Sequence, residues 1–71
     1  MACINADGTL TSTARRVLAT LEQPRTVEGI RDVTGQPLFH IRLSLREMEA
    51  AGLVTGADGS YTITQAGREK L

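Results

Sequence analysis

Two arginines and two neighbouring polar residues in the stretch TGQPLFHIRLSLREMEAAGLV, residues 34–54, are the side chains best suited to binding chemistry. Arg42 and Arg46 are four positions apart, so a helix would present both on one face, where guanidinium groups can bind phosphates. Gln36 can pair with adenine, and His40 can donate a hydrogen bond to a phosphate or to guanine. These residue types at this spacing favour contact with nucleic acid.

Each of these residues also has a purely structural interpretation. Gln36 stands beside Pro37 and fits a turn. His40 fits a solvated position on a helix surface. Arg46 lies three residues before Glu49, so the two side chains can pair on a solvated helix face. The sequence leaves both interpretations open for all of them.

Two bulky apolar residues, Phe39 and Leu43, form a second ridge on the same helix. The ridge lies beside the apolar stripe that we expect to face the core, which consists of Leu38, Ile41, Leu45 and Met48. Either Leu43 extends this core, or it stays exposed with Phe39 and marks an interface. Such an interface would be with DNA, where Phe39 touches a thymine methyl group, with a second copy of the chain, or with a partner protein.

The chain lacks the residue combinations that catalysis or metal binding would need. The single Cys3 and the single His40 cannot form an internal disulfide or a metal site, and Cys3 fits an ordinary free thiol. The chain has no Gly-rich phosphate loop after a strand, no paired carboxylates suited to a cleft, and no nucleophile beside a base. We therefore expect neither an enzyme nor a bound cofactor.

The charge of the chain is balanced, with eight lysines and arginines against eight acidic residues in 71. Most nucleic-acid-binding domains are basic because phosphate contacts supply much of their affinity, so neutrality disfavours that function. A fold can still gather its arginines on one face. Further candidates for phosphate contacts are Arg15, Arg16, Arg25 and Arg31.

The chain shows no sign of membrane insertion or export. No apolar run approaches the ~18 residues of a membrane span. The N-terminal residues lack the basic start and apolar core of a signal peptide. We expect a small cytoplasmic protein.

Periodicity and end signals predict one domain over residues 11–71, after a flexible N-terminal arm over residues 1–10. The predicted elements are a helix from a cap at Thr11 or Ser12 to Pro24, a helix from a cap at Thr26 to Gly35, a helix from Pro37 to Gly52, a hairpin that turns at Asp58-Gly59, and a helical tail capped by Thr64.

Two segments carry a resemblance to a known group of proteins. LSLREMEAAGLV is similar to the end of the third helix and the first wing strand of MarR-, ArsR- and PadR-like transcription regulators. YTITQAGREKL resembles their second wing strand and the helix after it. The resemblance implies a winged helix-turn-helix, an α+β and mainly α fold of three helices, a two-stranded β wing and a short C-terminal helical turn. The long dimerisation helices of MarR-like proteins and the Cys/His clusters of ArsR-like metal sensors have no counterpart here.

This resemblance implies a small regulator that reads double-stranded DNA with its third helix. The contacts would be Gln36, Phe39, His40, Arg42, Leu43 and Arg46, with Arg31 nearby and Ser44 as a further candidate. The protein would act as a homodimer or with a partner. The alternative is a winged helix that docks a protein through Phe39 and Leu43 without binding DNA. The turn at Asp58 favours this alternative, because DNA-contacting wings often carry Arg or Lys near the tip.

Overall fold

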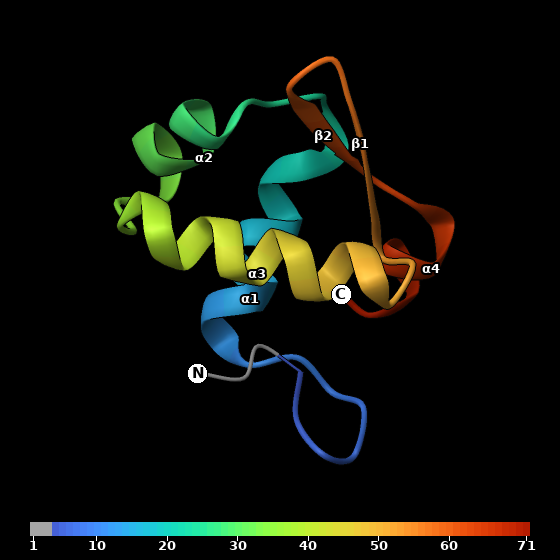
Figure 1. Ribbon diagram of the computed structural model, residues 1–71. Coiled ribbons are helices and arrows are strands. Elements are labelled where there is room, and N and C mark those ends of the chain that lie inside the picture. The colour runs from blue at the N-terminus through green and yellow to red at the C-terminus, as the bar shows by residue number, and fades with distance from the viewer. Residues whose placement is uncertain (1–3) are drawn as a thin grey trace.

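Four helices and one antiparallel hairpin make up residues 4–71, the part of the chain described in this computed structural model (Figure 1). In order they are α1 (Ser12–Ala19), the 3-10 turn η1 (Thr20–Glu22), α2 (Val27–Thr34), α3 (Leu38–Ala50), β1 (Val54–Ala57), β2 (Ser60–Ile63) and α4 (Gln65–Glu69). The fold is therefore α+β and mainly helical. Figure 1 shows α3 crossing α1, with α2 near its N-terminal end and the hairpin near its C-terminal end.

Three threonines begin helices where the sequence predicts caps. The hydroxyl groups of Thr11, Thr26 and Thr64 each accept a hydrogen bond from the backbone N–H three residues later, at 3.2, 3.1 and 3.1 Å. Each bond satisfies a backbone donor that the helix itself leaves unpaired, a contribution of about 1 kcal/mol per cap. The predicted starts of α1, α2 and α4 are confirmed.

The first helix ends earlier than the sequence predicts. Pro24 was expected to terminate it, but α1 ends at Ala19 and the chain continues as the tighter turn η1. Leu21 leaves the helical region, with φ −98° and ψ 16°, and its side chain is fully buried. The tighter turn thus directs Leu21 into the core, where its burial contributes roughly 1.5–3 kcal/mol.

Two turns then set the positions of α3 and the hairpin. Gly35 ends α2 with φ 74°, a left-handed conformation that glycine adopts without strain. Asp58 and Gly59 both have positive φ, 54° and 81°, as the two-residue turn of a twisted hairpin requires. The predicted hairpin is confirmed, with Val54 opposite Ile63 and Gly56 opposite Tyr61.

A backbone bridge joins the segment between α1 and α2 to the hairpin. The N–H of Arg25 donates to the carbonyl of Tyr61 at 3.0 Å, and the N–H of Tyr61 donates to the carbonyl of Arg25 at 2.8 Å. Arg25 therefore pairs with β2 through a single isolated antiparallel bridge. This pairing fixes the N-terminal end of α2 relative to the hairpin.

The packed domain begins before residue 11. Leu10 is only 5% exposed and lies in the core, Ile4 packs against that core, and the two residues form an antiparallel bridge. Between them, the N–H of Asn5 donates to the carbonyl of Thr9 at 2.7 Å. The boundary predicted after residue 10 is therefore wrong, because the apolar side chain of Leu10 has a place in the core. The first part of the predicted arm, with Cys3, lies outside the described residues.

The core is built by the three longer helices and the base of the hairpin. Its members are Leu10, Ala14, Val17, Leu18, Leu21, Ile30, Ile41, Leu45, Met48, Leu53, Val54 and Ile63. None of the helices within residues 4–71 is long and apolar enough to cross a membrane.

Candidate nucleic-acid interface

One face of α3 points away from the core and carries four of the predicted site residues. Buried positions 41, 44, 45 and 48 follow helical spacing and face inward. The opposite face presents Phe39, Arg42, Leu43 and Arg46, all exposed. Phe39 is 68% exposed and Leu43 is 37% exposed, so the alternative in which Leu43 extends the core is wrong. The structure thus brings two cations and two apolar side chains together on one surface.

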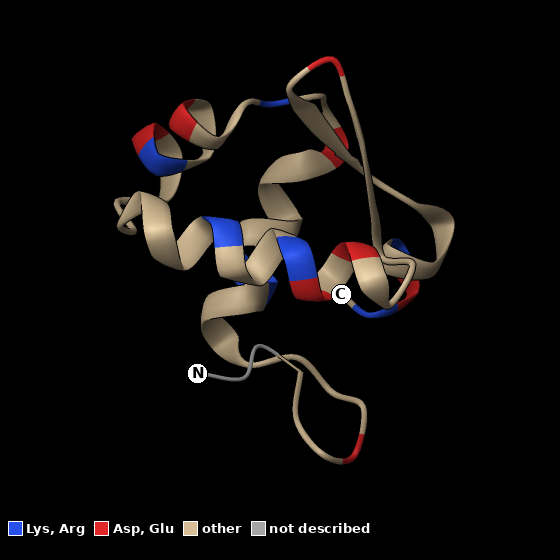
Figure 2. Cartoon of the chain, in the orientation of Figure 1, with Lys and Arg blue, Asp and Glu red and all other residues tan. Residues whose placement is uncertain are grey.

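The guanidinium groups of Arg42 and Arg46 are unengaged. Within residues 4–71 neither side chain forms a hydrogen bond or an ion pair, so the pairing of Arg46 with Glu49 that the sequence allows is absent. Figure 2 marks the positively charged positions of α3 as neighbouring blue bands along the helix. Unpaired guanidinium groups keep all their donors available for a ligand.

Most of the other cations are occupied. Within residues 4–71, Arg15 is the one further cation without a side-chain hydrogen bond or ion pair. Three cations donate to backbone carbonyls: Arg16 to Thr34 at 3.2 Å, Arg25 to Thr20 at 2.7 Å, and Lys70 to Gly8 at 3.1 Å. Two others pair with carboxylates: Arg31 with Asp32 at 3.8 Å and Arg68 with Glu22 at 3.1 Å. The predicted contact at Arg31 is therefore part of an exposed ion pair on α2.

Gln36 and Ser44 are buried, contrary to their expected role as contacts on the surface. Gln36 is 8% exposed, and its Nε2 donates to the backbone carbonyl of Thr13 at 3.4 Å. Its amide thus braces the start of α3 against α1. Ser44 is completely buried because it lies on the inward face of α3 between Ile41 and Leu45. Neither side chain faces solvent in this structure.

His40 lies on the flank of α3, away from the two arginines. Its side chain is half-buried, and its Nε2 atom is buried with no hydrogen-bond partner among residues 4–71. A helix turns about 100° per residue, so His40 lies on the opposite side of the Phe39–Leu43 ridge from Arg42. The structure does not bring His40 together with the arginines.

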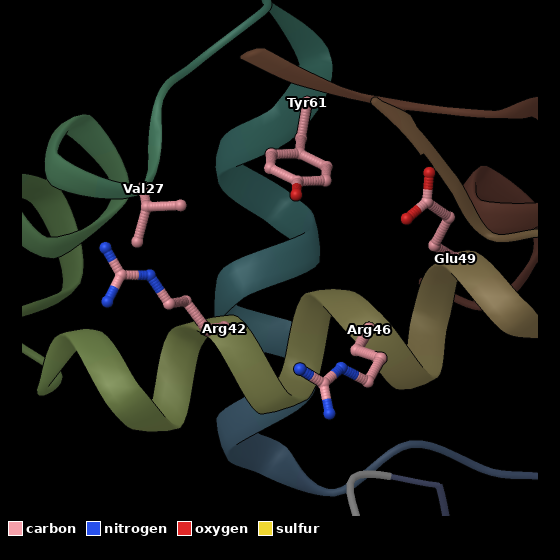
Figure 3. A pocket seen from close by; sticks show the side chains of 5 residues that line it. All are labelled: Val27, Arg42, Arg46, Glu49 and Tyr61. Carbon is pink, nitrogen blue, oxygen red and sulfur yellow. The ribbon is translucent and has the colours of Figure 1, made fainter. Parts of the chain in front are cut away.

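A pocket of about 250 Å³ opens between the outward face of α3, the start of α2 and the hairpin. It is lined by Val27, Arg42, Arg46, Glu49 and Tyr61 (Figure 3). The Tyr61 ring extends from β2, and its hydroxyl group points toward α3. No hydrogen bond to this hydroxyl is formed by residues 4–71.

Gly56 makes room for the Tyr61 ring. The two residues face each other across the hairpin, and a Cβ atom at position 56 would lie 2.8 Å from Cε2 of the ring and 3.1 Å from Cδ2. Carbon atoms do not approach this closely, so a side chain at this position would displace the ring. Sequence reasoning missed Tyr61 as a site residue. The signal was available, because a turn at Asp58-Gly59 sets Gly56 opposite Tyr61.

The tip of the hairpin is acidic. Asp58 is exposed in the turn, and the neighbouring residues Ala57, Gly59 and Ser60 carry no charge (Figure 2). Positive charge lies beside the hairpin where Arg42 and Arg46 of α3 border the pocket with Tyr61. Within residues 4–71, no three His, Cys, Asp or Glu side chains are grouped as metal ligands would be.

Comparisons with family models, with curated proteins and with solved structures find no match to this chain. The exposed face of α3 and the pocket beside it are the surfaces of the described residues suited to binding.

Proposed function

We propose that this chain is a winged helix-turn-helix domain that binds double-stranded DNA through the exposed face of α3 and regulates transcription. The order of elements supports the fold. Helices α2 and α3 are joined by a tight turn at Gly35, and the hairpin that follows α3 takes the place of the wing. The bridge between Arg25 and Tyr61 ties the wing to the segment before α2.

The observation that carries the proposed function is the pair of unengaged arginines on the outward face of α3. An α-helix fits into the major groove, which is about 12 Å wide. In that position Arg42 and Arg46 reach phosphates or guanine, because their guanidinium groups have no competing partner within residues 4–71. Phe39 and Leu43 supply apolar contact, for which the methyl group of thymine is the natural counterpart.

The neutral net charge limits the affinity that this surface can reach. Only a few cations are free to replace counterions on DNA, so binding in the absence of a preferred sequence should be weak and should depend only modestly on salt. Specific recognition then depends on the bases that Arg42, Arg46 and Phe39 meet. A homodimer would double the number of contacts and read two half-sites.

The proposed function is tested by mapping the surface that DNA contacts. A ¹⁵N-labelled sample is titrated with a short random duplex at about 50 mM salt, where phosphate contacts are strong. We expect the largest chemical-shift changes at Phe39, Arg42, Leu43 and Arg46 of α3. The absence of any change, or changes confined to α4 and the loop over residues 4–10, would overturn the proposal.

Exposed apolar surface on α3 favours a second candidate function, the docking of a protein. Phe39 is 68% exposed, and an aromatic side chain in that position is the kind of anchor that protein interfaces use. In this alternative the Phe39–Leu43 ridge packs against a second copy or a partner, and DNA is not bound. Sedimentation of the wild type and of Phe39→Ala over a range of concentrations separates the two cases. Self-association that Phe39→Ala abolishes, together with no response to DNA, would favour docking.

A further inference from the structure

The hydroxyl group of Tyr61 is the one donor in the pocket that comes from the hairpin. It points toward α3, and no partner for it exists among residues 4–71 (Figure 3). Its position is held at two points. The backbone of Tyr61 pairs with Arg25 in both directions, and the ring occupies the space that Gly56 leaves open. A polar group held in place without a partner is ready to bind a ligand.

The pocket carries a net positive charge. Arg42 and Arg46 contribute two positive charges, Glu49 contributes one negative charge, and Tyr61 contributes a neutral donor. The pocket also opens beside Val27, the first residue of α2, where the helix dipole adds positive potential. A volume of about 250 Å³ holds a phosphate group together with several water molecules. The composition therefore fits a single anionic group with several acceptor oxygens.

From these observations we propose that the pocket binds one backbone phosphate of the DNA duplex, and that Tyr61 donates a hydrogen bond to it. This inference rests on the proposed function, since the phosphate belongs to DNA lying along α3. Arg42 supplies the charge, and the Tyr61 hydroxyl fixes the position of the phosphate relative to the hairpin. The wing would thus take part in binding through Tyr61, which lies in the second residue pair from the turn, while the acidic Asp58 at the tip would repel phosphates.

Glu49 acts in the opposite direction. Its carboxylate lies on the wall of the same pocket and repels a phosphate, so it lowers the affinity that the arginines provide. A carboxylate in this position also disfavours entry of any second anionic group. The site therefore contains both its attractive and its repulsive charges on a single helix, at positions 42, 46 and 49.

The test compares three variants in a fluorescence anisotropy titration with a random duplex at about 50 mM salt. Tyr61→Phe keeps the ring beside Gly56 and removes only the hydroxyl, so affinity should fall about tenfold, as for a lost hydrogen bond to a charged group. The salt dependence should not change, because the phenol is neutral. Glu49→Gln should tighten binding, a direction that a folding defect does not produce. Thr62→Val is the matched control, since it removes a hydroxyl from the opposite face of the same strand and should have no effect.

The outcomes separate this inference from the proposed function. If the wild type binds DNA and Tyr61→Phe binds equally well, the inference is overturned and the proposed function stands. If the wild type does not bind DNA, the proposed function fails, and a titration with inorganic phosphate at constant ionic strength decides the inference. Chemical-shift changes confined to Val27, Arg42 and Tyr61 would then show a phosphate site served by another source. No change at these residues would overturn the site altogether.

Discussion

Removal of both outward arginines should flatten the salt dependence of DNA binding by a calculable amount. Each phosphate contact contributes a slope of about −0.9 to the plot of log K against log salt. Arg42 and Arg46 have no side-chain partner within residues 4–71, so on the proposed function they would supply two such contacts, a slope of about −1.8. Between about 50 and about 200 mM salt this pair accounts for a loss of affinity of about twelvefold. The double variant Arg42→Ala/Arg46→Ala should lose that dependence.

The assay is fluorescence anisotropy with a random duplex at four or more salt concentrations. The double variant should remain folded, with its free energy of unfolding within about 0.5 kcal/mol of the wild type, because neither side chain has a partner within residues 4–71. Arg68→Ala is the control. It removes a positive charge of the same kind from α4, where Arg68 pairs with Glu22, and it should leave the slope unchanged.

Two results would contradict this reasoning. If the slope of the double variant equals that of the wild type, phosphates are bound elsewhere and the exposed face of α3 is not the interface. If Arg68→Ala reduces the salt slope by as much as each arginine removed in the double variant, the effect comes from net charge and not from contacts on α3. Single variants at position 42 and at position 46 should each remove about half of the dependence.

Three further predictions concern stability and ionisation. Phe39→Ala should change the free energy of unfolding by less than about 1 kcal/mol, as thermal denaturation would show, because the side chain is 68% exposed; a large loss would place Phe39 in the core. Gly67→Ala should destabilise the fold by at least about 2 kcal/mol in urea denaturation, because a Cβ there would overlap the Leu53 carbonyl oxygen, and a stable variant would contradict the packing of α4. Hydrogen bonds from Thr9, first from its hydroxyl and then from its backbone N–H, hold the pKa of Asp7 below its ordinary value of 3.8. Ionised Asp7 therefore stabilises the fold above pH 3.8, and this contribution to the free energy of unfolding is lost as the pH falls through the lowered pKa of the folded state. Thr9→Val should raise the pKa of Asp7 in a carbon-detected NMR titration, and an unchanged pKa would refute this cause.

Local signals in the sequence predicted the ends of most elements. Thr11, Thr26 and Thr64 act as caps because a threonine hydroxyl reaches a backbone N–H three residues away and needs nothing else. The turn at Asp58-Gly59 is equally local, since the two residues themselves supply the positive φ angles. Such features are readable from sequence because every atom involved lies within one turn of chain.

Features that depend on distant residues were missed. Gln36 was expected at the surface, but its burial depends on a carbonyl of α1 that lies 23 positions earlier in the chain. Ser44 was considered as an outward contact, and it is buried because the inward face of α3 comprises positions 41, 44, 45 and 48. Leu38, expected in that stripe, is half-buried. A helix packed between α1 and α2 takes its orientation from both neighbours, which its own sequence does not specify.

The bridge between Arg25 and Tyr61 has a consequence for how the pocket comes into being. The two residues are far apart in the chain, with all of α2 and α3 between them, so their pairing closes a long loop and carries the corresponding entropy cost. The helices can form early from local contacts, whereas this bridge needs both of them in place. We therefore expect Tyr61 to reach its position only after both helices are packed. The proposed contact through Tyr61 would thus require a docked hairpin, and a chain with intact helices but an undocked hairpin would keep its arginines without the pocket.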